Sequence, residues 1–97
     1  MDALTKELHS FLVRMGYEGV EHEQEHMMEH LLRLLSPENE EAVIRYYGLF
    51  GEERWSLSEL GRQWQMGDED TMARIDQCLR RLAVTPEWQM MKENQAK

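Results

Sequence analysis

Residues 56–82 constrain the fold more than any other part of the chain. Apolar residues recur there at three- and four-residue spacing in two runs, first Leu57, Leu60 and Trp64, and then Met72, Ile75, Leu79 and Leu82. That spacing predicts two amphipathic helices. Gly67 lies between the two runs. A helix, a short turn that contains glycine and a second helix form the outline of a helix-turn-helix.

Both predicted helices begin with residues that favour a helix N-terminus. Ser56 and Glu59 have the spacing of a capping box, in which the hydroxyl and the carboxylate each satisfy a free amide of the first turn. Asp68 is expected to cap the second helix, with Glu69 and Asp70 following in its first turn. The sequence therefore predicts where each helix starts.

The rest of the chain is also periodic, and the whole predicts an all-α protein, a compact bundle of about five to six short helices. Two helices are expected over residues 2–15 and 20–35. A third should start after a Ser36 cap and end at Gly48, before a loop over residues 49–55. A short last helix after Thr85 should carry Trp88 and Met91 back onto the body, and residues 92–97 read as a frayed tail.

One apolar face of each helix is expected to be buried. The expected core residues are Leu4, Leu8, Phe11, Leu12 and Met15 in the first helix, Val20, Met27, Met28, Leu31, Leu34 and Leu35 in the second, and Ala42, Val43 and either Tyr46 or Tyr47 in the third. Cys78 lies on or beside the apolar face of its helix, and we expect it to be buried as a small hydrophobic residue.

The length and composition indicate one domain. The chain has 97 residues, enough for a single modest core. We divide it into an acidic N-terminal helical pair over residues 1–35, the helix-turn-helix over residues 36–84, and a short helix and tail over residues 85–97. No apolar run approaches the roughly 20 residues that span a membrane, and the N-terminus lacks the pattern of a secretory signal. We therefore expect a cytoplasmic protein with no membrane partner and no cofactor.

The net charge is the most informative part of the composition. The net charge of −8 is opposite in sign to that of most free-standing DNA-binding domains, which are basic because they neutralise phosphates. An acidic domain of this size is repelled by DNA at long range unless its basic groups are gathered on one surface. The charge weakly favours a protein partner.

Residues 22–26 match the H-E-x-x-H pattern of zinc metalloproteases, and His30 extends the histidine series at the same spacing. Histidines four residues apart on a helix can share a zinc ion. Glutamates surround these histidines, however, and the helical wheel places them away from the apolar stripe. We interpret the segment as a solvated charged face. His22, His26 and His30 remain weak metal candidates, and we expect no enzyme.

Several short motifs follow one another in a specific order. They are Leu35-Ser36-Pro37, Tyr47-Gly48-Leu49, Gly51, Leu57-Ser58-Glu59-Leu60-Gly61 and Leu79-Arg80-Arg81-Leu82. In order and spacing they resemble the fourth conserved region of bacterial housekeeping-type sigma factors. The resemblance covers residues 35–82, about half of the chain, with no net insertion.

The resemblance implies a helix-turn-helix that reads promoter DNA with its second helix and docks an apolar groove on the flap of the RNA polymerase β subunit. The DNA-contact candidates on this sequence are Arg62, Gln63, Arg74, Gln77, Arg80 and Arg81. The groove candidates are Leu35, Val43 and Tyr47. Nothing before residue 35 resembles the promoter-melting sigma regions, so we expect that the chain does not act alone as a complete sigma factor.

The start of the second helix departs from the family, which has a Ser cap followed by Arg and Gln residues. Here residues 68–76 contain four acids and one arginine, a local charge of 1 − 4 = −3. Acids stabilise a helix N-terminus, but they oppose the approach of a phosphate or base edge. The apolar stripe leaves Ala73, Arg74, Gln77 and Arg81 pointing outward, either toward DNA or simply toward solvent.

Two functions follow as hypotheses. The first is a small transcription protein that acts in initiation or its regulation by binding promoter DNA, RNA polymerase or both. The second is an acidic interaction module, anti-sigma-like or an adaptor, that has lost DNA binding and contacts the polymerase flap or another transcription protein. The sequence also leaves open a homodimer through the Met-rich N-terminal helices.

Overall fold

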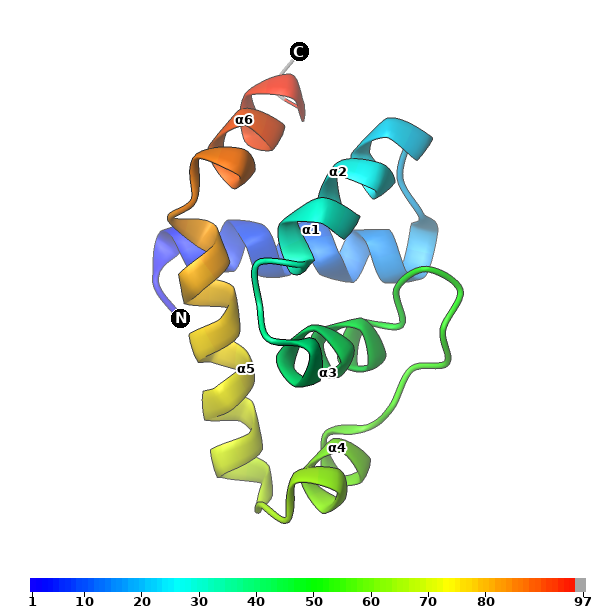
Figure 1. The fold of residues 1–97 in the computed structure, drawn as a ribbon, viewed down its shortest axis with the longest axis vertical. Coiled ribbons are helices and arrows are strands. Elements are labelled where there is room, and N and C mark those ends of the chain that lie inside the picture. The colour runs from blue at the N-terminus through cyan, green and yellow to red at the C-terminus, as the bar shows by residue number, and fades with distance from the viewer. Residues whose placement is uncertain (96–97) are drawn as a thin grey trace.

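The computed structural model describes residues 1–95 of the chain, which form helices joined by turns and loops, with no strand among them (Figure 1). The helices are α1 (Ala3–Glu18), α2 (His22–Leu32), α3 (Pro37–Tyr47), α4 (Leu57–Trp64), α5 (Asp68–Ala83) and α6 (Pro86–Gln95). The predicted all-α class is confirmed. None of these helices is both long and apolar enough to cross a membrane.

Helix α5 is the axis on which the other elements assemble. It packs against α1, α3, α4 and α6, while α2 packs against α6 (Figure 1). All six helices contribute side chains to a single core, from Leu8 and Leu12 in α1 to Trp88 and Met91 in α6. The N-terminal helical pair and the helix-turn-helix therefore share one hydrophobic interior.

Helix α1 continues beyond the predicted end at Met15 and terminates at Gly19, which has a φ of 82°. Gly16 lies inside the helix, and the end of α3 comes close to it. A Cβ at position 16 would collide with the carbonyl oxygen of Tyr47. Leu4 was expected in the core but is exposed, and Thr5 is buried in its place, so the buried face is turned by one residue at the start of the helix.

Helix α2 is shorter than predicted and its end changes the buried face. It runs from His22 to Leu32, after which residues 33–35 form a turn with bonds from Leu34 N to Leu31 O and from Leu35 N to Leu32 O. The i to i−3 pattern breaks the helical phase. Leu34, predicted to be buried, is 51% exposed, and Leu32 is buried instead at 1%.

Helix α3 begins and ends as the sequence predicts. The Ser36 hydroxyl accepts a hydrogen bond from the backbone N–H of Asn39 at 3.3 Å, and Gly48 adopts a left-handed conformation at the C-terminus. Tyr47 is the buried tyrosine of the pair, with 2% of its surface exposed. Arg54, from the loop that follows, donates to the Tyr47 carbonyl at 2.9 Å and fixes the loop against the end of the helix.

The last helix also follows the prediction at its start. The Thr85 hydroxyl accepts from the backbone N–H of Trp88 at 3.3 Å, and the Trp88 indole packs edge-on against Phe11. The helix continues to Gln95, so residues 92–95 are not the expected frayed tail. Lys92 forms an ion pair with Glu7 of α1 at 2.8 Å, which holds this end in place. Residues 96 and 97 lie outside the described residues.

The helix-turn-helix and its surface

The turn between α4 and α5 depends on Gly61. A Cβ at this position would lie 2.7 Å from the carbonyl oxygen of Met66 and 2.8 Å from Oγ1 of Thr71. The Met66 backbone N–H also donates to the Gly61 carbonyl at 2.8 Å, and Gln65 takes the left-handed conformation with φ 58°. Only glycine lets α4 approach the turn this closely.

The predicted cap of α4 is present with one change. The Glu59 backbone N–H donates to the Ser56 hydroxyl at 3.1 Å. The Glu59 carboxylate accepts from that same hydroxyl at 3.2 Å. The carboxylate therefore binds the capping side chain rather than the free amide of a full capping box.

The cap of α5 differs from the prediction. Gly67 is the N-cap residue and Asp68 is the first residue of the helix. The Asp68 carboxylate accepts a hydrogen bond from the Ser58 hydroxyl of α4, at 3.3 and 3.4 Å to its two oxygens. Asp68 thus links the two helices instead of capping the second one, and Glu69 and Asp70 remain exposed beside it. The N-terminal end of α5 is an acidic surface.

Arg74 is committed to contacts within the protein. Its Nε donates to Asn39 Oδ1 at 3.0 Å, and its guanidinium lies 3.6 Å from the Glu38 carboxylate. The guanidinium also lies 3.8 Å from the ring centroid of Trp64. These contacts join α5 to α3 and α4, so this predicted DNA-contact residue holds the helix-turn-helix together.

Three of the other predicted DNA-contact residues lie on separate parts of the surface. Arg80 forms an ion pair with Asp76 at 2.9 Å. Arg62 and Gln63 are exposed on α4, next to Trp55 and Glu59. The structure does not bring these three residues together with the rest of the predicted set.

Three predicted DNA-contact residues do lie together, namely Arg74, Gln77 and Arg81. They line a groove of about 480 Å³ between α5 and the start of α3. We call it the α3–α5 groove, and its lining residues are Leu35, Asn39, Met66, Asp70, Ala73, Arg74, Gln77, Cys78 and Arg81. Arg81 and Gln77 are exposed at its edge. Within residues 1–95, Arg81 makes no ion pair. The groove therefore offers a guanidinium and an amide to a partner, beside the carboxylate of Asp70.

The sequence did not identify Asn39 and Met66 as part of this surface. Asn39 lies 35 residues before Arg74 in the chain, and no local pattern connects the two. Met66 belongs to the turn, where side-chain direction depends on the left-handed residue before it. Cys78, expected to be buried, lines the floor of the groove with its thiol largely covered, and burial raises the pKa of that thiol.

The predicted apolar partner groove is not an open surface. Val43 is fully buried, Tyr47 is 2% exposed and Leu35 is 6% exposed. Helix α1 covers this side of α3. The Tyr47 hydroxyl lies 2.7 Å from Nδ1 of His9, and the two rings meet edge to face. These residues belong to the core, and α1 is the N-terminal helix that packs on α3.

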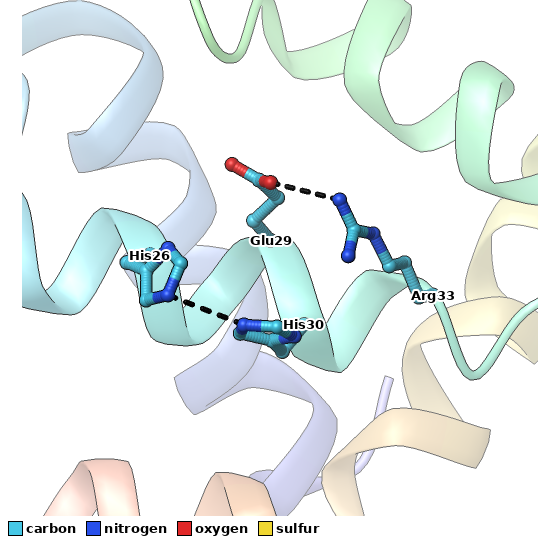
Figure 2. Close-up of polar contacts among 4 residues, drawn as sticks. All are labelled: His26, Glu29, His30 and Arg33. Carbon is cyan, nitrogen blue, oxygen red and sulfur yellow. Dashed lines mark hydrogen bonds and ion pairs between the residues drawn. The ribbon is translucent and has the colours of Figure 1, made fainter.

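The histidine series lies on the exposed side of α2, as expected. His26 and His30 face each other, with their Nε2 atoms 3.2 Å apart, and Glu29 forms an ion pair with Arg33 at 3.0 Å (Figure 2). The two histidines in contact, His26 and His30, thus lie one helical turn after the His22–His26 pair of the H-E-x-x-H pattern. Among the described residues, no group of three His, Cys, Asp or Glu side chains is arranged to hold a metal.

Comparison with protein-family models, with curated proteins and with solved structures finds no match for this chain.

Proposed function

We propose that this protein is a small transcription protein, similar to the fourth region of sigma factors, that acts in transcription initiation or its regulation. The observation that carries the proposal is the α4–α5 helix-turn-helix, assembled around Gly61 and clamped by Arg74. Gly61 belongs to one of the motifs that resemble the sigma family, and its contacts give that motif a physical role in forming this element. Arg74 lies between the motifs.

The contact surface that we assign to this function is the exposed edge of the α3–α5 groove, at Gln77 and Arg81. Arginine and glutamine side chains can form paired hydrogen bonds with base edges, and arginine binds carboxylates equally well. The chain carries a net charge of −8, so we expect weak binding to free duplex DNA and a steep loss of that binding with added salt. RNA polymerase would supply the remaining affinity by holding the protein near the promoter.

The experiment measures binding of the fluorescently labelled protein to RNA polymerase core enzyme and to short duplex DNA at low salt. We expect Arg81→Glu to weaken binding by about tenfold or more, because it reverses the charge of a group exposed at the contact surface. Arg14→Glu is the matched control, since it changes the net charge equally on α1, outside the groove. The proposal would be overturned if the protein bound neither RNA polymerase nor duplex DNA.

A second candidate is an acidic interaction module that has lost DNA binding. The exposed carboxylates of Asp68, Glu69 and Asp70 at the start of α5 favour it, because they stand where a recognition helix would approach phosphates. This candidate predicts polymerase binding without duplex affinity at any salt concentration. The variant with Asp68→Asn, Glu69→Gln and Asp70→Asn separates the two, since it should gain affinity for duplex DNA only if the rest of the surface can read DNA.

A further inference from the structure

His26 and His30 bring two ring nitrogens close together on the exposed side of α2. Both side chains are exposed, and their Nε2 atoms lie 3.2 Å apart (Figure 2). The ring centroids are farther apart, at 4.6 Å, so the nitrogens lie on the parts of the rings that face each other. As a hydrogen bond this contact uses the proton of only one ring, and an exposed bond of this kind adds little stability.

The same distance suits a shared metal ion. With metal–nitrogen bonds of about 2.0–2.1 Å, nitrogens 3.2 Å apart subtend roughly 100–105° at the ion, close to the tetrahedral angle.

The charges around the pair also favour a cation. Helix α2 contains three glutamates and no lysine or arginine. His30 is in its last turn, where the helix dipole attracts positive charge. Arg33, the cation that follows the helix, is held by Glu29 (Figure 2). An incoming metal ion therefore meets a negative helix whose nearest guanidinium is already paired.

We propose that His26 and His30 bind one borderline transition-metal ion such as Zn²⁺ through their Nε2 atoms, with water completing the coordination shell. Imidazole nitrogens suit zinc, copper and nickel. With two protein ligands the site is open and exchangeable, unlike the closed four-ligand sites of structural zinc. The bound ion links residues one turn apart and stabilises α2, because it binds the folded helix and not the unfolded chain.

The test titrates ZnCl₂ into the tag-free full chain and records heat, with a thermal melt of the same samples. We expect one ion per chain and a higher melting temperature with Zn²⁺. His26→Gln and His30→Gln should each weaken binding by about tenfold or more, because a single imidazole remains. His22→Gln is the matched control, since His22 is also exposed on α2 and should leave Zn²⁺ affinity unchanged.

Three outcomes would overturn the proposal. The first is a His30→Gln variant that binds Zn²⁺ as tightly as the original chain. The second is equal weakening by His22→Gln, which would place the ion on the H-E-x-x-H pattern instead. The third is a stoichiometry of one ion per two chains, which would mean that the ion bridges two molecules.

Discussion

The guanidinium of Arg74 lies 3.8 Å from the ring centroid of Trp64, and this contact joins α5 to α4. The same guanidinium group reaches Asn39 and Glu38 on α3. One side chain on α5 therefore contacts both α3 and α4.

Replacement of Arg74 should destabilise the protein. We expect Arg74→Ala to lower the free energy of unfolding by about 1–3 kcal/mol, from loss of the stacked cation and the Asn39 hydrogen bond. Arg74→Lys should recover only part of this, because lysine lacks the planar guanidinium. Urea denaturation measures both. Arg33→Ala is the control, since its exposed pair with Glu29 should contribute less than about 0.5 kcal/mol. Equal effects at the two positions would refute a clamping role.

We expect replacement of Gly61 by alanine to lower the stability of the protein, which is the opposite of its usual effect in a helix. Alanine normally stabilises a helix interior by about 1 kcal/mol relative to glycine. Here the added Cβ would meet the Met66 carbonyl oxygen at 2.7 Å, so we expect Gly61→Ala to destabilise the protein by about 1–3 kcal/mol, as overpacking does. Thermal or urea unfolding gives the sign. A stabilised Gly61→Ala variant would mean that the turn is looser than described.

Gly67→Ser provides the matched comparison six residues later. Gly67 is the N-cap of α5, its backbone is extended with φ −74°, and a Cβ there meets nothing within 4 Å. Serine is a better cap than glycine, so we expect a gain of a few tenths of a kcal/mol, about 0.3. The same unfolding measurement applies, and a loss of stability would contradict the assignment of the cap.

Tyr47 should make stability depend on pH at the alkaline end. Burial raises the pKa of its phenol above the ordinary value of about 10. Between the two values the unfolded chain releases the proton while the folded chain keeps it. Stability is therefore fully present below pH 10 and falls as the pH rises above it, by up to about 1.4 kcal/mol per unit. Unfolding in urea between pH 9 and 11 measures this fall.

The control for this pH dependence is Tyr47→Phe, which removes the buried phenol and keeps the ring. We expect a loss of about 0.5–1.5 kcal/mol at neutral pH, from the missing hydrogen bond to His9. The decline above pH 10 should be smaller than in the original chain. The same decline in both proteins would contradict the assignment to Tyr47.

Leu32 and Leu34 test the end of α2. Leu32 is buried and Leu34 is half exposed, so Leu32→Ala should cost about 2–5 kcal/mol, whereas Leu34→Ala should change stability by less than about 0.5 kcal/mol. Urea denaturation of the two variants separates them. A larger loss of stability for Leu34→Ala than for Leu32→Ala would support the longer helix that the sequence pattern predicts.

The sequence by itself determined the all-helical class and most helix boundaries. Ser36, Ser56 and Thr85 cap the helices that they were expected to cap, and Gly48 ends α3. These features depend on contacts within a few residues, which is why local patterns are sufficient to predict them. The buried face of α5 followed from its apolar spacing for the same reason.

The tertiary structure decided which surfaces remain available. Val43 and Tyr47 belong to an apolar face that could equally have met a partner, and only the packing of α1 on α3 shows that the chain covers it. The sequence pattern places Arg74 on the outward side of its helix, and only the tertiary structure shows that Asn39 and Trp64 contact it. Leu34 changed sides because the helix stopped two residues before it. Each of these outcomes depends on residues distant in the chain or on where a helix stops, and a periodic pattern carries no information about either.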